Sequence, residues 1–373
     1  MRIERAPHPV PLPPGEGEES TADGRSGTVA EMFCGILPPY ILVSIAENGT
    51  PEERRRALAT LIFTERLRGQ RRALAALPVI TPVGEKRRDV FDAQKKTRLP
   101  GKLVREEGSA PSQDLAVDEA YDGAGSTYDF YLEIHERNSI DGKGMRIDST
   151  VHYDTNYDNA FWNGAQMVYG DGDQKLFARF TASLDVIGHE LTHGVTAHEA
   201  NLSYQDQPGA LNESFSDVFG TLVKQRSRLE TATQADWLIG GELLLPQVQG
   251  SALRSMKEPG TAYDDPVLGK DPQPSTMEGY VVTSEDDGGV HINSGIPNHA
   301  FYLAAVAIEG FAWEKAGKIW YEALTNRLKA DSDFADCADQ TIAAASDLFG
   351  KNGFEERAVR EAWKAVGVSS SRS

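Results

Sequence analysis

Apolar positions change their spacing near the middle of the chain, which predicts two structurally different halves. Over 90–180, aromatic and β-branched residues mix with Asp-Gly and Gly-Lys-Gly turn signals, a pattern typical of strands joined by tight turns. The segment 128–154 is the clearest example. From residue 183 onward, apolar residues recur at intervals of three and four in six segments, as expected for amphipathic helices. The sequence therefore predicts an α+β protein, with a β-rich lobe over 85–184 and a mainly helical region over 185–373.

The N-terminal stretch follows neither pattern. Residues 1–30 are rich in proline, glycine and acidic side chains, and we expect them to be disordered. The segment 31–84 contains two adjacent prolines, Pro38 and Pro39, and leads into a stretch with basic residues on its polar face. Its apolar residues recur at roughly helical spacing and are Leu58, Leu61, Ile62, Leu67, Leu74 and Leu77. A small helical unit followed by a linker is the structure predicted for this segment.

Charge and hydropathy narrow the classes of partner. The 38 Lys and Arg and 56 Asp and Glu residues give a net charge of −18, which repels phosphate backbones and argues against nucleic acid as a partner. No apolar run approaches the roughly 20 residues of a membrane-spanning helix, so no membrane partner is expected. The run over 33–45 contains two prolines and follows Glu31 instead of a basic flank, so it does not read as a secretory signal. Cys34 and Cys337 are the only cysteines and allow at most one disulfide.

The most distinctive local motif is His189-Glu190-Leu191-Thr192-His193. Residues four apart lie on one face of a helix, so both imidazoles can bind one ion, and Glu190 beside them can take a proton from a metal-bound water. Two surface histidines on an amphipathic helix are the alternative, and chance gives the motif in about one of a hundred such chains. The apolar flanks instead predict a buried helix, in which unpaired histidines would be costly.

The next predicted helix offers a third metal ligand. Glu213 lies 24 residues after His189, which leaves room for one helix, a turn and a returning helix. Asp217 follows Glu213 by one helical turn and could accept the second N–H of a ligand histidine. A solvated acidic stripe is the alternative, but the two motifs together are far more specific than either alone. Three protein ligands and one open position are what a catalytic zinc requires.

These motifs, in this order, resemble those of the thermolysin family of neutral metallopeptidases. HELTH followed by ALNESFSDVFG carries the resemblance, and the segments 159–173, 253–256 and 288–295 agree with it in order and spacing. The similarity runs over 90–368, about three-quarters of the chain. It implies a two-lobed fold with the active-site helix between a β-rich and a helical lobe, and a zinc-dependent endopeptidase activity on protein or peptide substrates.

The resemblance also implies a role for individual residues around the zinc. His189, His193 and Glu213 correspond to the zinc ligands, and Glu190 to the general base. Further positions match residues that support the ligands (Asn212, Asp217), donate to the oxyanion of the tetrahedral intermediate (Tyr204, His291), or keep that imidazole oriented and protonated (Asp286). Spacing alone does not link His291 to the zinc, since its flanking glycines show only that a turn is near.

Substrate recognition is implied in the same way. The family binds substrate in an extended form along an edge strand, which here contains Asn159 and the Ala160 backbone. Arg254 resembles the arginine that binds a substrate carbonyl near the cleaved bond. The walls of an apolar S1′ pocket correspond to Phe177, Phe180, Val186 and Leu253, and they predict cleavage on the N-terminal side of Leu, Phe, Ile or Val. Each of these four could equally be a core residue.

One departure from the family pattern concerns calcium. Well-known members hold a double calcium site with acids around the two central helices, and Asp185 matches one of these acids. The next expected acid is Lys224, whose ammonium group would repel a dication. Acidic residues are also fewer than the family pattern leads one to expect over 236–242. Calcium is a conceivable ligand of the protein, but we predict that the double site is lost.

A second departure is the short N-terminal unit. The segment starting at Cys34 resembles the precursor segment of protealysin-like peptidases, which implies a zymogen inhibited by its own propeptide. Either the Cys34 thiolate takes the open position on zinc, or the rigid Pro38-Pro39-Tyr40 stretch plugs the cleft. We favour the plug, because a lone cysteine is more often inert than a ligand. Removal of the propeptide is predicted to require a cut within 77–89.

Three other functions are compatible with a zinc-binding motif of this kind. A zinc aminopeptidase would need a motif that grips a free α-amine, and the sequence contains none that we recognise. A protease-like binding module is disfavoured because Glu190 and His291 are both retained. A structural zinc site is disfavoured by ligands that include no cysteine. Members of the family are mostly secreted, whereas this sequence shows no recognisable leader, so leaderless export and cytoplasmic retention both stay open.

Overall fold

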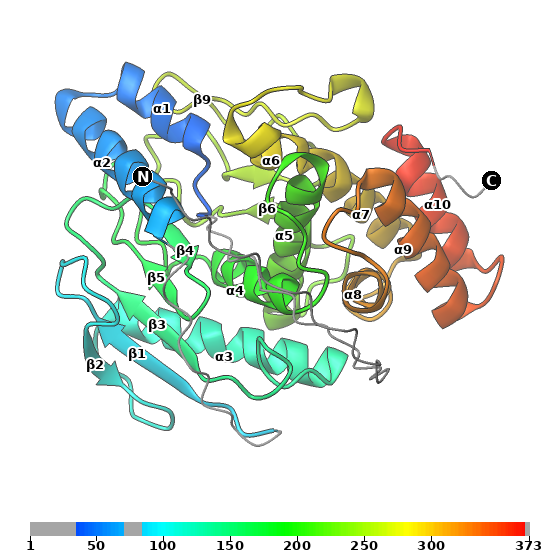
Figure 1. The fold of residues 1–373 in the computed structure, drawn as a ribbon, viewed down its shortest axis with the longest axis horizontal. Helices are drawn as coiled ribbons and strands as arrows, with labels where there is room; N and C mark the ends of the chain where they lie inside the picture. Colours follow the sequence, from blue (N-terminus) through cyan, green and yellow to red (C-terminus); the bar gives the residue numbers. More distant parts are fainter. Residues whose placement is uncertain (1–34, 71–83, 370–373) are drawn as a thin grey trace, which may run out of the picture.

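The computed structural model describes residues 35–70 and 84–369, in which a helical hairpin, a β-rich lobe and a helical lobe follow one another along the chain (Figure 1). The predictions for residues 1–30 and for Cys34 lie outside the described residues. The expected α+β architecture with two lobes is confirmed. The helix that carries the HExxH motif lies between the lobes (Figure 1).

The N-terminal hairpin consists of α1 (Pro39–Asn48) and α2 (Pro51–Gln70). Thr50 and Glu53 form a reciprocal cap at the start of α2, because the Thr50 N–H donates to Glu53 Oε2 at 2.7 Å and the Glu53 N–H to Thr50 Oγ1 at 3.4 Å. The packed face of α2 differs from the leucine-rich face that the spacing suggested. Leu58 and Ile62 are 49% and 67% exposed, whereas Leu61 is partly buried against the main core, and α2 docks mainly through small, polar and aromatic residues.

The β-rich lobe is built on a five-stranded sheet with the order β2-β1-β3-β5-β4. The pairs β1–β3 and β3–β5 are parallel, and both outer pairs are antiparallel. The strand β4 lies at one edge of this sheet and pairs with β5 alone within the sheet, which leaves its other side for an added strand. The strands are β1 (Arg88–Asp92), β2 (Lys102–Arg105), β3 (Ile147–Val151), β4 (Ala160–Trp162) and β5 (Met167–Tyr169).

One strand prediction in this lobe was wrong. The start of the segment 128–154 is helical and forms the last part of α3 (Leu115–His135), which packs against the sheet (Figure 1). Its aromatic residues favour strands in general, but that preference is weak compared with packing. Buried positions in α3 recur every three or four residues, and the Asp114 carboxylate caps the helix by accepting from the N–H groups of Ala116 and Val117.

Two long helices cross the middle of the molecule, α4 (Leu184–His198) and α5 (Asp206–Arg228). Glycines at their crossing allow an unusually close approach. A Cβ atom on Gly220 would lie 2.4 Å from the carbonyl oxygen of Asp185, and one on Gly188 would lie 3.0 Å from the Cα of Gly220. This contact fixes the two helices that carry the candidate metal ligands.

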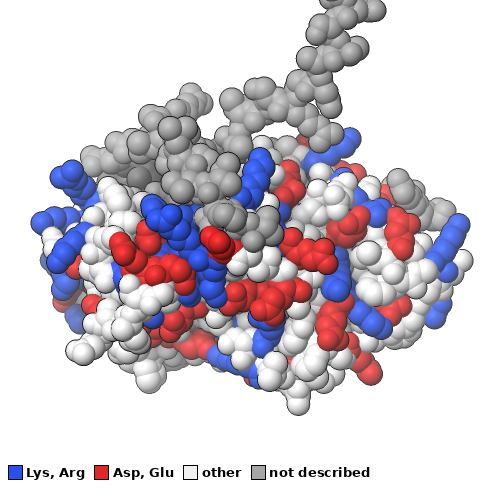
Figure 2. All heavy atoms as spheres, turned by 90° about the horizontal axis from the view of Figure 1, so that it is seen from below, with Lys and Arg blue, Asp and Glu red and all other residues white. Residues whose placement is uncertain are grey.

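Helices dominate the rest of the chain, as predicted. The remaining elements are β6 (Leu238–Ile239), β7 (Arg254–Ser255), β8 (Asp264–Asp265), β9 (Gly269–Lys270), η2 (Met277–Gly279), α6 (Asp286–Asn293), α7 (Gly295–Ile308), α8 (Ala316–Asn326), α9 (Phe334–Phe349) and α10 (Phe354–Ala365). None of the described helices is both long and apolar enough to cross a membrane. Acidic and basic side chains are interspersed on the face shown in Figure 2, so the net negative charge does not gather there in one patch.

Candidate metal centre

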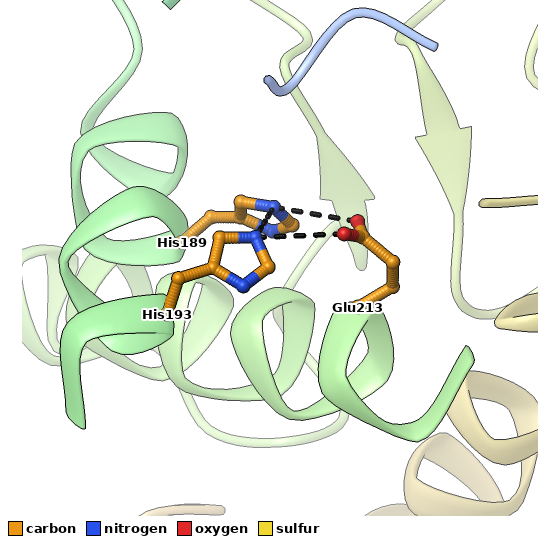
Figure 3. Close-up of side chains that lie close together, drawn as sticks. All are labelled: His189, His193 and Glu213. Carbon is orange, nitrogen blue, oxygen red and sulfur yellow. Dashed lines mark hydrogen bonds and ion pairs between the residues drawn. The ribbon is translucent and has the colours of Figure 1, made fainter. Parts of the chain in front are cut away.

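Three side chains from α4 and α5 converge on one point. His189 Nε2 and His193 Nε2 lie 3.0 Å apart, and these atoms lie 3.6 and 3.5 Å from the Glu213 carboxylate oxygens. All three residues are at most 3% exposed. The two imidazoles come from successive turns of α4, and the carboxylate reaches them from α5 (Figure 3). The residues predicted to bind metal are therefore together in space.

The donor set fits zinc. His189 Nδ1 lies 2.8 Å from Asp217 Oδ1 and His193 Nδ1 lies 2.8 Å from Asn212 Oδ1, so each Nδ1 carries the proton and each Nε2 presents a lone pair to the centre. Two ligands at tetrahedral angles around zinc stand about 3.4 Å apart, close to the separations found here. Two imidazole nitrogens and one carboxylate are also one of the ligand sets that hold catalytic zinc in proteins.

Electrostatics keeps two of these ligands in the protonation states that metal binding requires. Burial lowers the pKa of His193 to about 4, so this imidazole is neutral at pH 7. Burial raises the pKa of Glu213, but its electrostatic interactions with the imidazoles of His291, His193 and His189 outweigh burial and lower the pKa to about 2. A neutral imidazole and an ionised carboxylate are the forms that bind metal.

Glu190 lies beside the three ligands with its carboxylate turned toward strand β4. Its Oε2 accepts a hydrogen bond of 2.9 Å from the Trp162 backbone N–H. Burial raises the pKa of Glu190 well above its usual value, and the negative charge of Glu213 raises it further. The N–H groups of Trp162 and Ile36 oppose this shift. The residue predicted to be the general base thus combines a fixed position with a strong affinity for a proton.

His291 and Asp286 belong to α6, and Tyr204 lies between α4 and α5. His291 faces the three ligands, and the other two residues contact its imidazole. Asp286 holds the imidazole through Oδ1, 2.6 Å from His291 Nδ1, and accepts from the His291 backbone N–H through Oδ2 at 2.9 Å. The Tyr204 hydroxyl lies 3.2 Å from His291 Nε2 and donates to Glu213. Burial lowers the pKa of His291, but the charges of Asp286 and Glu213 outweigh it and raise the pKa. The imidazole is therefore favoured in its protonated, donating form.

A left-handed turn presents Asp286 to the imidazole. Asp286 and Asp287 have φ near +50°, and the two glycines that follow have φ of +85° and +77°. A non-glycine residue in this region costs of order 1 kcal/mol or more. Because the chain doubles back within these four residues, the carboxylate of Asp286 can contact both the ring Nδ1 and the backbone N–H of His291.

Asp217 connects the metal ligands to Arg254. Arg254 Nε donates to Asp217 Oδ2 and Nη2 to Oδ1, both at 2.8 Å, and the same carboxylate holds His189. Asn298 Nδ2 donates to Asp217 Oδ2 at 2.8 Å. Asn298 was not predicted from the sequence, although an amide within the apolar helix α7 was a usable signal. Ser216, whose Oγ lies 3.1 Å from His193 Nδ1, was not predicted either.

The chain's own N-terminal segment lies along β4. Gly35 forms an antiparallel bridge with Phe161, and the Ile36 N–H donates to the Ala160 carbonyl oxygen at 3.2 Å. The Leu37 N–H donates to Asn159 Oδ1 at 2.9 Å, and Asn159 Nδ2 donates back to the Leu37 carbonyl at 3.2 Å. The edge strand predicted to hold substrate therefore holds residues 35–37.

This arrangement changes the details of the predicted plug. Arg254 Nη1 donates to the Ile36 carbonyl oxygen at 3.1 Å, so the segment that contacts the candidate site begins before Pro38-Pro39-Tyr40. Pro39 opens helix α1 and lines a small cavity together with Asn159 and His291. The Tyr40 hydroxyl is buried, and its pKa is raised by burial first and then by neighbouring Tyr263 and Asp271.

The four residues proposed for an apolar pocket are all buried. They belong, with Ile36, to one contiguous apolar cluster, and the rings of Phe177 and Phe180 are 6.0 Å apart. The side chains in question are Phe177, Phe180, Val186 and Leu253. Their membership of the same cluster as Ile36 is compatible with a pocket wall as well as with a core.

Lys224 occupies the centre of an oxygen-lined cage. Its Nζ donates to Asp185 Oδ2 at 2.7 Å, to the Leu238 carbonyl at 2.6 Å, and lies 3.0 Å from Asp236 Oδ1. The lysine is 1% exposed, and burial lowers its pKa less than the charges of Asp185 and Asp236 raise it. The ammonium group thus supplies the positive charge that these acids require.

We predict that this ammonium group makes stability independent of calcium. Calcium and calcium-selective chelators are expected to leave the thermal midpoint of the zinc-loaded chain unchanged, because Lys224 already neutralises Asp185. Lys224→Met should lower the midpoint by about 10 °C, since it leaves a buried carboxylate unpaired. Differential scanning calorimetry measures both, with Lys351→Met at an exposed site as the control. A midpoint that falls by tens of degrees when calcium alone is removed contradicts this prediction.

Comparison with protein families supports the geometric findings. A model described as the thermolysin metallopeptidase catalytic domain matches residues 83–197, and one described as the α-helical domain of the same family matches residues 200–368. A third model, described as the protealysin propeptide, matches residues 34–73.

Individual relatives agree with these matches. An extracellular metalloprotease of Pectobacterium carotovorum is 53% identical over 337 residues, which cover 90% of this chain and 96% of the relative. A thermolysin of Alicyclobacillus acidocaldarius is 42% identical over 287 residues, which cover 74% of this chain and 50% of the relative. Among solved structures, the precursor of protealysin, a metalloproteinase from Serratia proteamaculans, matches with a TM-score of 0.84 and 52% identity, covering 90% of this chain and all of that one.

Proposed function

The chain belongs to the thermolysin family of metallopeptidases and carries a protealysin-type propeptide, and from this premise we propose that it uses zinc to cleave peptide bonds before Leu, Phe, Ile or Val. The observation that carries the proposal is the convergence of His189, His193 and Glu213 next to Glu190. We propose three functional units. They are a propeptide over 31–84, a β-rich lobe over 85–184, and the active-site helix with the helical lobe over 185–373.

The proposed reaction assigns a task to each residue around the ligands. When held by His189, His193 and Glu213, zinc supplies Lewis-acid polarisation of the scissile carbonyl and a more acidic water. Glu190 takes a proton from the attacking water and delivers it to the leaving amine. The Trp162 N–H holds the Glu190 carboxylate in position between the two steps.

Negative charge that develops on the carbonyl oxygen requires donors in fixed positions. His291 and Tyr204 are assigned this task, supported by the contacts that hold them next to Glu213. Asp286 acts through His291, since it orients the ring and favours the protonated form. Donors that are already in place reduce the reorganisation needed in the transition state.

The seated segment 35–37 suggests how substrate is held. It pairs with the Ala160 backbone and Asn159, and its Ile36 carbonyl accepts from Arg254. A substrate in the same register would place an apolar side chain where Ile36 lies. This register supports a preference for a bulky apolar residue directly after the cleaved bond.

The preference predicts a pattern of cleavage sites. After processing, the enzyme should cut a defined peptide mixture mostly at bonds whose C-terminal side carries Leu, Phe, Ile or Val. Replacing Leu by Asp at that position in a blocked peptide should lower kcat/KM about a hundredfold or more, because a carboxylate cannot be buried unpaired in an apolar pocket. Mass spectrometry of the products measures both. The prediction is contradicted if the choice of bond depends on the residue before the cleaved bond and not on the residue after it.

Blocked peptides also separate this function from that of a zinc aminopeptidase. Cleavage of a peptide with an acetylated N-terminus supports the endopeptidase, whereas activity restricted to free N-termini supports the alternative. For the place of action, we propose the outside of the cell, because a close relative is an extracellular metalloprotease. Detection of the processed chain in culture medium of intact cells tests this, and its confinement to the cell contradicts it.

A further inference from the structure

Helix α2 covers a cluster of aromatic rings on the β-rich lobe. Tyr153, Tyr157 and Phe161 pack edge to face, with ring centroids 5.5 to 5.9 Å apart. This cluster is separate from the main apolar core. Phe63 of α2 closes it from outside, with centroids 5.3 Å from each tyrosine and 6.4 Å from Phe161. Under this helix the three rings are at most 2% exposed.

A carboxylate next to the rings binds the same helix. Arg56 meets Asp158 with two nitrogens, Nη2 at 2.5 Å from Oδ1 and Nε at 3.0 Å from Oδ2. Its Nη1 donates to the Thr155 carbonyl at 3.3 Å and to Asn156 Oδ1 at 3.4 Å. Among the described residues, no other cationic side chain pairs with Asp158. The lobe thus offers a set of acceptors that matches a guanidinium fork.

Both contacts come from one face of α2. Arg56, Thr60 and Phe63 are spaced by four and three residues, so they line one stripe about 10 Å long. Thr60 Oγ1 links the two ends of the stripe, because it donates to the Asn156 carbonyl at 3.3 Å and accepts from the Asp158 N–H at 3.2 Å. The chemistry recognised is a basic side chain followed by an aromatic ring two helical turns later.

The covered surface continues into the substrate cleft. Phe161 belongs to β4, the strand along which residues 35–37 lie, and Asp158 immediately precedes Asn159. In Figure 1 one end of helix α2 lies close to β4, in agreement with the contact between Phe63 and Phe161. One polypeptide therefore occupies the edge strand and this surface together, with the helix C-terminal to the extended segment.

Loss of the propeptide changes this surface. The ring surfaces that Phe63 covers would be exposed to water, and Asp158 would lose its bidentate partner. Burial raises the pKa of Asp158, whereas the hydrogen bonds and charge of Arg56 lower it, so the carboxylate is costly to leave unpaired. An exposed aromatic patch beside the Asp158 carboxylate can bind a ligand that, like α2, presents a guanidinium group and an aromatic ring.

We propose that Tyr153, Tyr157, Phe161 and Asp158 form a docking site of the processed enzyme for an amphipathic helix of a protein substrate. This inference rests on the proposed function, since it requires a processed peptidase. The helix presents a basic side chain and an aromatic ring seven residues apart, and it follows the cleaved strand in the substrate chain. Binding at two linked points raises the effective concentration of the strand at the cleft.

Three substrates test the proposal on the processed enzyme. The first is a short blocked peptide with Leu after the cleaved bond. The second carries, beyond a Gly-Ser linker of about 15 residues whose span is roughly 20 Å, the sequence of residues 51–70. The third is identical except for Arg56→Ala and Phe63→Ala. The second should show a KM about tenfold below that of the other two, with similar kcat, because a charged bidentate pair and an aromatic contact contribute at least that factor.

Enzyme variants separate docking from catalysis. Asp158→Asn and Tyr153→Leu should raise the KM of the helix-bearing substrate toward that of the short peptide, and leave hydrolysis of the short peptide unchanged. Asp154→Asn is the matched control, because it removes a nearby carboxylate that accepts from the N–H of the next residue, Thr155, and not from Arg56. Equal KM values for all three substrates, or an unchanged KM in Asp158→Asn, overturn the proposal.

A binding measurement keeps the inference independent of activity. If the chain does not hydrolyse the short peptide, the proposed function fails, and the docking site is tested on the full chain carrying Arg56→Ala and Phe63→Ala. A fluorescent peptide of residues 51–70 should bind this chain by anisotropy, and Asp158→Asn should weaken binding about tenfold. No saturable binding overturns the proposal. Binding of the intact propeptide without any effect of the helix on substrate KM also overturns it, since the surface then serves the propeptide alone.

Discussion

Glu190→Gln is expected to lower kcat/KM for a blocked peptide about a thousandfold or more while leaving zinc bound. The amide has the shape of the carboxylate and can keep the hydrogen bond from the Trp162 N–H, but it cannot accept the proton of the attacking water. His189, His193 and Glu213 are untouched, so the zinc content should match that of the parent.

Two measurements on one preparation check this expectation. Hydrolysis of the blocked peptide gives kcat/KM, and elemental analysis gives zinc per chain. Glu361→Gln, at an exposed position on α10, is the control for a neutralised glutamate. If Glu190→Gln keeps activity within tenfold of the parent, another group takes the proton and the proposed mechanism is contradicted.

Gly35→Val is expected to raise the activity of the uncut precursor about ten- to a hundredfold. A Cβ atom at Gly35 would lie 2.7 Å from Asn159 Nδ2 and 3.1 Å from the Ala160 carbonyl oxygen, both on the edge of the cleft. Valine therefore forces the extended segment off β4, at a cost of about 1–3 kcal/mol for overpacking. Helix α2 keeps its own contacts through Arg56 and Phe63, so the propeptide should stay docked while the cleft opens.

Initial rates before any change of mass measure this effect. Mass spectrometry of each time point verifies that the chain is still uncut, and Glu190→Gln in the same background shows that the activity belongs to the site. Val43→Ala, on the exposed side of α1, is the control variant. A Gly35→Val precursor as silent as the parent would mean that inhibition does not depend on the segment 35–37, and the Cys34 route would then need testing.

Local patterns in the sequence were enough for the metal ligands. His189 and His193 share one helix face by spacing alone, and Glu213 follows at a distance that one turn and one helix explain. The family resemblance supplied what spacing could not. His291 comes from a helix far along the chain, and only a fold brings it to 3.6 Å from Glu213. Its left-handed approach turn was visible merely as flanking glycines.

Long-range pairing explains most of what the sequence did not predict. Asp217 was expected to hold a histidine, but its bidentate contact with Arg254 joins residues 37 positions apart and has no local signature. Helix α3 was mistaken for strands because aromatic residues favour both buried strands and buried helix faces, and tertiary packing decides between them. The packed face of α2 was misplaced for a related reason, since Arg56 and Phe63 bind partners on another lobe.

The aromatic surface below α2 was also missed, although a signal was present. Tyr153, Tyr157 and Phe161 recur every four residues, yet the segment is irregular and ends in a strand, so helical spacing was misleading there. Their edge-to-face packing depends on a β-rich scaffold that turns all three rings to one side. Contacts of this kind follow from the fold and could be inferred only once it was known.

A zinc titration of the processed enzyme tests the central claim most directly. Metal-free enzyme should not cleave a blocked peptide with Leu after the scissile bond. Activity should rise linearly with added zinc to a plateau at one zinc per chain, the capacity of the site that His189, His193 and Glu213 form within residues 35–70 and 84–369. Glu213→Gln should weaken zinc binding and shift this plateau to higher zinc. Full cleavage by enzyme shown to be free of metal would contradict the account.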